Sequence, residues 1–305
     1  MHTMSRASEI SHNVFLGPTP DPALDPSSDE SRYDILIETT DLAQIPNSRS
    51  LRTFKTMIED LDHATLHFEF PSSGSIMPPT WSHVEVDGLM ELCRWVYDIA
   101  NAKEDSEDEK DSDGDSVMVI SEPIRPQKVL IHCSDGYTET SMFGLAYFMY
   151  AEGLPAADAW LKLHKEKCRN FFAYPSDVLL LTSIEPRILQ ESPVFKGNAL
   201  TVQQPQWLSK IDGSLPSRIL PYMYLGNLGH ANNPEMLKEL GITRILSVGE
   251  PLTWAKEFTD SWSKNHLLYL DRVQDNGMDP LTEEFERCLQ FIGKHSDPIF
   301  DCRHT

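Results

Sequence analysis

The chain has 305 residues with 47 acidic and 26 basic side chains, which gives a formal net charge of -21. A strongly negative chain repels nucleic acids and anionic membrane surfaces, so we expect no nucleic acid and no membrane among its partners. No apolar run approaches the roughly 20 residues of a membrane-spanning helix, and no signal-peptide pattern opens the chain. We therefore expect a protein of the cytoplasm, the nucleus or both.

The five cysteines are odd in number and scattered, without a CxxC pair. This spacing favours reduced thiols over a disulfide framework or a zinc site. We expect neither a metal ion nor another cofactor.

The first third of the chain predicts two strands, at 33–37 and 64–70, and one helix. From Val86 to Ala100 the apolar residues recur at helical spacing, which predicts an amphipathic helix. The run 104–115 that follows is almost entirely acidic or polar and has nothing to bury. We predict a solvated, disordered insertion at 102–117.

Order is predicted to return at 129–131, a short apolar run typical of a buried strand. A tight loop follows, then a predicted helix at 141–149 that Gly153 closes, and another near 156–163. Alternating strands and helices predict an α/β fold, with a sheet flanked by helices on both faces.

The chain also contains an internal repeat. The segment 13–17 is echoed at 223–226, and the order strand, strand, helix recurs at 244–248, 266–270 and 285–292. We predict one near-complete domain at 1–190, a linker at 191–217, and a truncated second copy at 218–305.

The segment from His132 to Thr140 can carry chemistry. A loop between a buried strand and a helix N-terminus presents backbone N–H groups and the positive end of the helix dipole, which together bind anions. A cysteine at its start, Cys133, would have a lowered pKa and act as a nucleophile. The alternative is a buried structural cysteine beside a hydrogen-bonded histidine.

The spacing here resembles the cysteine-dependent dual-specificity protein phosphatases, whose strand ends in His-Cys, followed by five residues, Arg, and Ser or Thr. His132, Cys133, Gly136 and Thr140 match that pattern, and Glu139 departs from it. The tandem arrangement is similar to fungal two-domain members of the family.

The resemblance implies that Cys133 is the nucleophile that forms a cysteinyl-phosphate intermediate and that His132 tunes its thiolate. It also implies that Thr140 assists breakdown of the intermediate. Glu139 occupies the place of an arginine that grips two phosphate oxygens, and a carboxylate there repels a dianion. We expect domain 1 to be a weak or inactive phosphatase. The remaining phosphate-loop residues are Ser134, Asp135, Gly136, Tyr137 and Thr138.

The family also needs an aspartic acid that protonates the leaving oxygen, on a loop after the preceding strand. Residues 71–76 contain no carboxylic acid. In the second copy Asp275 resembles the catalytic acid, with a turn residue before Asn-Gly as the alternative reading. Cys302 is interpreted as a remnant of the second phosphate loop.

Three functions remain open. The first is a protein-tyrosine or dual-specificity phosphatase in signalling, a hydrolase acting on a phosphoprotein substrate. The second is a pseudophosphatase that holds a phosphoprotein partner without catalysis. The third is rhodanese-like thiol chemistry at Cys133, against which the placement of Gly136 and Thr140 argues.

Overall fold

The structure, a computed structural model, describes residues 6–20, 33–60, 65–75, 82–102, 125–197, 203–255, 258, 262–273, 278–279 and 281–293. The acidic run, Asp275 and Cys302 lie outside these residues. The chain divides into two compact units. The first unit comprises residues 3–159 and 171–202, and the second comprises 1–2, 160–170 and 203–305.

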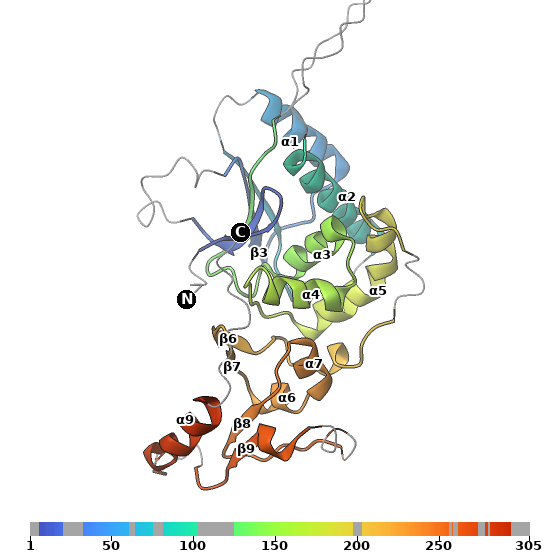
Figure 1. Ribbon diagram of the computed structural model, residues 1–305. Helices are drawn as coiled ribbons and strands as arrows, with labels where there is room; N and C mark the ends of the chain where they lie inside the picture. The colour runs from blue at the N-terminus through green and yellow to red at the C-terminus, as the bar shows by residue number, and fades with distance from the viewer. Residues whose placement is uncertain are drawn as a thin grey trace, which may run out of the picture. The chain divides into compact units, whose positions relative to one another are not determined.

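A five-stranded sheet in the order β1-β2-β5-β3-β4 forms the centre of the first unit (Figure 1). Strands β2, β5, β3 and β4 run parallel, and β1 is antiparallel to β2. The strands span Ser8–Ser11 (β1), Val14–Pro18 (β2), Ile35–Thr40 (β3), Leu66–Pro71 (β4) and Val129–Cys133 (β5).

Strand β5 is the middle strand and pairs on both sides. Val129 lies opposite Val14 of β2 and opposite Ile35 of β3. All five residues of β5 are buried, which explains why its sequence is a continuous apolar run ending in His-Cys rather than an alternating pattern. The strand therefore fixes where the loop after Cys133 begins.

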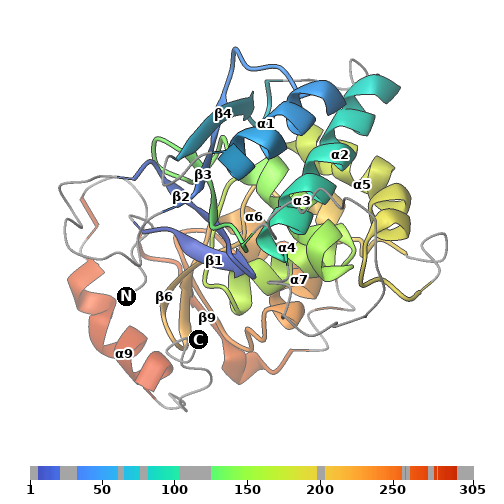
Figure 2. The same cartoon turned by 90° about the horizontal axis from the view of Figure 1, so that it is seen from above.

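The helices of the first unit pack against this sheet and against one another (Figure 2). Helix α3 is the most enclosed, since its residues from Ser141 to Ala151 are all buried. It ends at Gly153, which adopts a left-handed conformation with φ 62°. The helices span Ser48–Asp60 (α1), His83–Ala100 (α2), Ser141–Glu152 (α3), Ala156–Lys165 (α4, which both units share) and Pro175–Glu191 (α5).

The predicted α/β class, with a central sheet flanked by helices, is confirmed, although one face of the sheet at β3 and β4 is open to solvent. Along β3 and β4 the side chains of Glu38, His67 and Glu69 are exposed, while the alternate residues are buried. The period-two alternation of these strands therefore marks one buried and one solvated face.

Helix α1 was not predicted. The Asn47 side chain accepts hydrogen bonds from the backbone N–H groups of Arg49 and Ser50, both at 3.0 Å, and so caps its first turn. Its packing rests on Leu51, which is buried, and on Phe54, whose ring stacks on Phe68 with centroids 4.9 Å apart. Leu51, Phe54 and Ile58 recur at helical spacing, a pattern that the sequence reasoning overlooked.

The second unit contains two separate two-stranded sheets, β6-β7 and β8-β9. The strands predicted at 244–248 and 266–270 and the helix near 285–292 are present. No described helix is long and apolar enough to cross a membrane. The elements are Ser217–Leu220 (β6), Met223–Leu225 (β7), Leu228–Ala231 (α6), Pro234–Glu239 (α7), Ile245–Val248 (β8), Leu267–Leu270 (β9) and Phe285–Gly293 (α9), with short 3-10 turns at Leu208–Lys210, Lys264–His266 and Leu281–Glu284.

Substitution of Gly136 tests how closely the loop after β5 packs against β2. Gly136 has φ 65°, and a Cβ atom there would lie 2.2 Å from the backbone carbon of Gly17. Gly136→Ala should therefore lose more stability than the roughly 1–2 kcal/mol that a left-handed alanine costs by itself. Calorimetric unfolding of the full chain measures this.

Gly241→Ala is the matched control, because Gly241 has φ 75° but nothing within 4 Å of its built Cβ. It should show the backbone cost alone. Equal losses for the two variants would contradict the tight seating of the loop.

Candidate active-site loop

The predicted phosphate loop runs from Cys133, the last residue of β5, to Thr140, which precedes α3. The buried strand and the enclosed helix hold its two ends, so its length and turn are fixed by packing. The structure brings all of the predicted loop residues together in one turn of chain. Cys133, Gly136 and Thr140 are buried, Ser134 and Asp135 are exposed, and Tyr137, Thr138 and Glu139 are half-buried.

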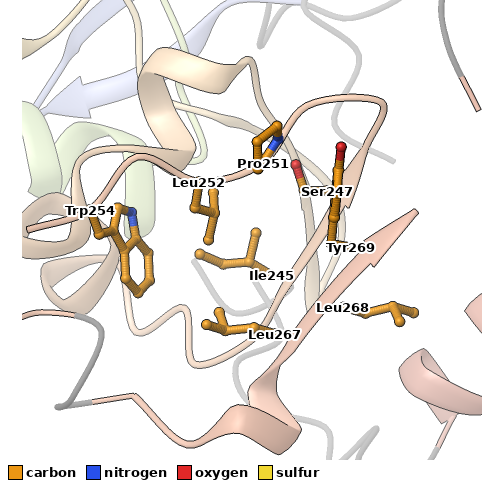
Figure 3. A pocket seen from close by; sticks show the side chains of 8 residues that line it. All are labelled: Ile245, Ser247, Pro251, Leu252, Trp254, Leu267, Leu268 and Tyr269. Atoms are coloured by element: carbon orange, nitrogen blue, oxygen red, sulfur yellow. The ribbon is translucent and has the colours of Figure 1, made fainter. Parts of the chain in front are cut away.

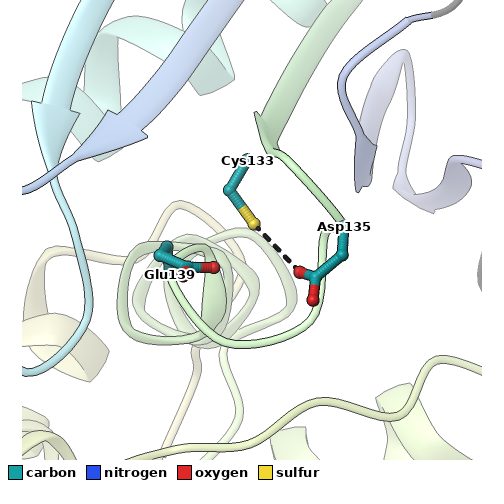
Figure 4. A group of neighbouring side chains, drawn as sticks. All are labelled: Cys133, Asp135 and Glu139. Atoms are coloured by element: carbon teal, nitrogen blue, oxygen red, sulfur yellow. Dashed lines mark hydrogen bonds between the residues drawn. The ribbon is translucent and has the colours of Figure 1, made fainter.

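The Cys133 sulfur lies among polar groups of its own loop (Figure 4). The backbone N–H of Gly136 donates to Sγ at 3.1 Å, and the thiol donates to Asp135 Oδ1 at 3.5 Å. The same Asp135 oxygen accepts the backbone N–H of Tyr137 at 2.8 Å. A carboxylate oxygen thus sits beside the sulfur and takes up one of the loop's amide donors.

Glu139 completes a cluster of one thiol and two carboxylates. Ligand atoms of Cys133, Asp135 and Glu139 all lie within 4.8 Å of one another. The segment from Cys133 to Thr140 contains no lysine or arginine that would balance them. A thiolate with two carboxylates is a donor set that Zn²⁺ accepts, so these three side chains are where a metal ion would bind if the loop held one.

These neighbours set the charge state of the sulfur. Burial raises the pKa of the Cys133 thiol most, and the hydrogen bond and negative charge of Glu139 raise the pKa further. Hydrogen bonds from the amides of Asp135 and Gly136 act in the opposite direction without offsetting the rise. The prediction of a lowered pKa at Cys133 is therefore wrong, because the loop amides are outweighed by burial and by the inverted charge at position 139.

His132 is held by Thr19, which directly follows β2, and by Thr39 of β3. Its Nδ1 lies 3.2 Å from Thr19 Oγ1, and its carbonyl accepts the Thr39 hydroxyl at 3.2 Å. Burial lowers the pKa of the imidazole, which favours the neutral ring. A neutral ring supplies no positive charge to stabilise a thiolate at Cys133.

The Thr140 hydroxyl is fully buried and has no hydrogen-bond partner among the described residues. It keeps the position that the sequence pattern predicted. Its role in the chemistry stays a prediction.

The segment after β4, where a catalytic acid was sought, is instead tied down by serines. Ser73 donates both its backbone N–H and its hydroxyl to the Glu139 carbonyl, at 2.9 and 3.1 Å. Its Oγ accepts the backbone N–H of Met142 at 2.8 Å. Ser72 and Ser73 are both buried. The segment after β4, where the catalytic acid was expected, is therefore hydrogen-bonded to the end of the loop and the start of α3.

Sequence reasoning missed Asp177, a buried carboxylate in the first turn of α5. Its Oδ1 accepts the backbone N–H of Gly74 at 3.2 Å, while Oδ2 has no partner among the described residues. Burial raises the pKa of this carboxyl to about 6. In the sequence it reads as an ordinary helix-start acid, and only the fold brings it to the segment after β4.

The free cysteines among the described residues include Cys93 and Cys133, which are buried, and Cys288. Cys168 is disulfide-bonded. The expectation of reduced thiols is therefore wrong at that residue.

No protein-family model matches the chain. Among curated proteins the chain is similar to Dual specificity protein phosphatase PPS1 of Saccharomyces cerevisiae, with 30% identity over 254 residues. The match covers 73% of this chain and 28% of the yeast protein, so the chain spans less than a third of that relative's length. The match supports the predicted resemblance to the dual-specificity protein phosphatases.

Solved structures similar to the chain include three phosphatases. Tk-PTP in its active form is 19% identical, with a TM-score of 0.37 over 59% of this chain and 97% of that one. Cydia Pomonella PTP-2 phosphatase is 13% identical, with a TM-score of 0.36 over 59% and 89%. DUSP15 is 12% identical, with a TM-score of 0.34 over 63% and 97%.

Asp177 predicts a pH dependence of stability. Its folded pKa of about 6 lies above its ordinary 3.8, so the folded state binds the proton more tightly. Asp177 therefore stabilises the folded state at a pH below 3.8. This stabilisation of about 2–3 kcal/mol at most is lost as the pH rises from 3.8 to about 6. Asp177→Asn should remove this slope, so the variant gains stability over wild type at pH 7 but not at pH 4.

Asp158→Asn is the control, since Asp158 is an exposed carboxylate in the first turn of α4. Urea unfolding of the three proteins at both pH values measures the difference. A constant gap between wild type and Asp177→Asn at the two pH values would show that the carboxyl is not perturbed.

Proposed function

We propose that this chain is a pseudophosphatase: a dual-specificity phosphatase-family protein whose first unit does not hydrolyse phosphate esters and instead holds a phosphoprotein partner. The observation that carries the proposal is the position of the Cys133 sulfur between the carboxylates of Asp135 and Glu139. Three separate requirements of phosphate transfer fail at this loop.

The first requirement is attraction for a dianion. Two unit charges 4 Å apart interact by about 4 kcal/mol at an effective dielectric constant of about 20. Asp135 and Glu139 both oppose an incoming phosphate at such distances. A helix N-terminus typically contributes about 0.3–1 kcal/mol to anion binding, which is too little to compensate.

The second requirement is a thiolate. Because burial and Glu139 raise the pKa of Cys133, the sulfur stays protonated at neutral pH. A thiol is a poor nucleophile toward phosphorus. In addition, Asp135 Oδ1 lies 3.5 Å from Cys133 Sγ. This is about the distance to which a phosphorus atom would have to approach the sulfur in order to be attacked.

The third requirement is a proton donor for the leaving oxygen. Buried serines occupy the segment after β4, and their hydroxyls are engaged with Glu139 and Asp41. Asp275, which resembles the family's acid, remains a candidate for the second copy only.

Rhodanese-like sulfur transfer is not favoured. It also needs a thiolate at Cys133, and the same carboxylates oppose one. The negative charge at the loop argues against both reactive alternatives.

Hydrolysis of aryl phosphates by the full chain should be at background. The assay compares wild type with Cys133→Ser, and the two should be indistinguishable at neutral pH. A clear turnover that disappears in Cys133→Ser would sink the proposal.

Glu139→Arg should restore oxyanion binding before it restores catalysis. A bidentate guanidinium adds two charge-assisted hydrogen bonds of roughly 1.5–3 kcal/mol each, or on the order of 10² to 10⁴ in affinity for tungstate. Glu139→Gln is the control, since it removes the negative charge without adding a positively charged donor. Its tungstate affinity should rise less than that of Glu139→Arg. Calorimetric titration of the three proteins measures this.

Turnover by Glu139→Arg should remain slow on alkyl phosphates, because acid assistance is typically worth about 10² to 10⁴ in rate and no acid follows β4. If Glu139→Arg binds tungstate no better than wild type, the segment is not an anion-binding loop.

A further inference from the structure

The open face of the first unit's sheet carries two facing carboxylates. Glu38 of β3 lies directly opposite Glu69 of β4, and on its other side Glu38 lies opposite His132 of β5. Side chains that are opposite in register point to the same face of a sheet, so these three residues form one row across it. His132 is buried, whereas Glu38 and Glu69 are exposed. The row therefore ends in two carboxylates that face solvent.

The two carboxylates share an open cavity of about 390 Å³. No lysine or arginine occurs among the described residues that line it, which are Leu36, Glu38, His67, Phe68 and Glu69. His132 does not balance the row either, because burial lowers the pKa of its imidazole and favours the neutral ring. Like charges directly opposite each other on neighbouring strands destabilise a sheet. A cationic side chain placed against Glu38 and Glu69 would reverse that cost.

The outer edge of β4 lies beside these carboxylates. In the described sheet β4 is the last strand in the order. The backbone N–H of Leu66 donates to the Asp34 carbonyl, on the β3 side, at 2.8 Å. Because alternate residues of a strand bond to the same neighbour, the backbone N–H and C=O groups of His67 and Glu69 point away from β3. Such an edge is a template for another strand.

The charge at this edge selects the strand that can add to it. A second copy of the chain, with a net charge of -21, would bring further carboxylates against Glu69 and be repelled. A basic strand would instead form opposite-charge pairs across the edge, which stabilise a sheet. On the other face of β4, Phe68 stacks on Phe54 of α1. The side chains between the basic ones should therefore be apolar.

The cavity at β8 and β9 in the second unit differs in kind (Figure 3). It has a volume of about 220 Å³, and the described residues that line it carry no charged side chain. Ile245, Leu252 and Trp254 are among them. An apolar wall offers no counter-charge to a guanidinium or an ammonium group, and burying an unpaired charge is costly. A basic segment is therefore expected at β4 and not at this cavity.

We propose that the outer edge of β4 binds an extended basic segment of a partner protein, which adds to the sheet as a further strand and sets its arginine or lysine side chains against Glu38 and Glu69. Backbone hydrogen bonds to His67 and Glu69 supply affinity, and the carboxylates supply specificity. None of these residues belongs to the loop 133–140. The proposal thus goes beyond the proposed function and holds whether or not Cys133 reacts.

A synthetic peptide of alternating valine and arginine, six residues long and blocked at both ends, tests the surface by calorimetric titration into the full chain. Glu38→Lys combined with Glu69→Lys should lower the peptide affinity about tenfold or more, because two cross-strand attractions become repulsions. Glu166→Lys combined with Glu239→Lys is the charge-matched control, since both glutamates are exposed and lie outside this face. At physiological salt the control should change the affinity by less than about twofold, because distant exposed charges are screened.

Equal losses in the two double variants would reduce the binding to general attraction by a negative chain and overturn the proposal. Absence of measurable binding to wild type would overturn it as well.

Strand addition is tested on the wild-type chain, which needs no folded variant. Two versions of the peptide, N-methylated at one or the other set of alternate residues, lose the N–H donors of opposite edges. One version should bind and the other should not. In hydrogen exchange the amides of His67 and Glu69 should slow when the unmethylated peptide is added, while that of Phe68, which faces β3, should not change. Equal binding of both methylated peptides, or unchanged exchange at His67 and Glu69, would overturn the proposal. Because the peptide carries no phosphate, neither result bears on the loop at Cys133.

Discussion

Uncompensated negative charge within one turn of chain is the constraint on which this site depends. The strand β5 and the helix α3 deliver Cys133 to a loop with backbone N–H donors, an arrangement suited to anions. Asp135 and Glu139 then occupy that loop with carboxylates of their own. In the proposed function the thiol keeps its proton, and anion affinity and the thiolate fail together because both depend on positive charge at the same place.

The loop is closely packed although it carries negative charge. Gly136 adopts the positive φ that brings the loop against Gly17, and Ser73 ties the segment after β4 to the end of the loop. Close packing combined with electrostatics that oppose phosphate is what the proposed binding module would require. The chain is similar to a yeast dual-specificity phosphatase, and in the proposed function the carboxylates of Asp135 and Glu139 oppose phosphate binding at its loop.

The sequence predicted those parts of the fold that local pattern encodes. Strand β5, the loop and α3 were predictable because burial on both sides produces an unbroken apolar run and because the His-Cys pattern has fixed spacing. Helix α1 was overlooked, although Leu51, Phe54 and Ile58 recur at helical spacing among its polar residues. Asp177 could not be found either, because its partner Gly74 lies 103 residues away in the chain. The loop amides alone predicted a lowered pKa for the Cys133 thiol, whereas its pKa is raised, although Glu139 was visible in the sequence.

Direct titration of the Cys133 thiol tests the central claim. Ultraviolet thiolate absorbance is followed against pH for wild type and for Glu139→Gln, with Cys133→Ser subtracted from each. The account predicts a wild-type pKa above the ordinary 9.0 of a cysteine and a lower pKa in Glu139→Gln, because the carboxylate no longer opposes the thiolate. A wild-type thiol already ionised at neutral pH, or a pKa unmoved by Glu139→Gln, would contradict it.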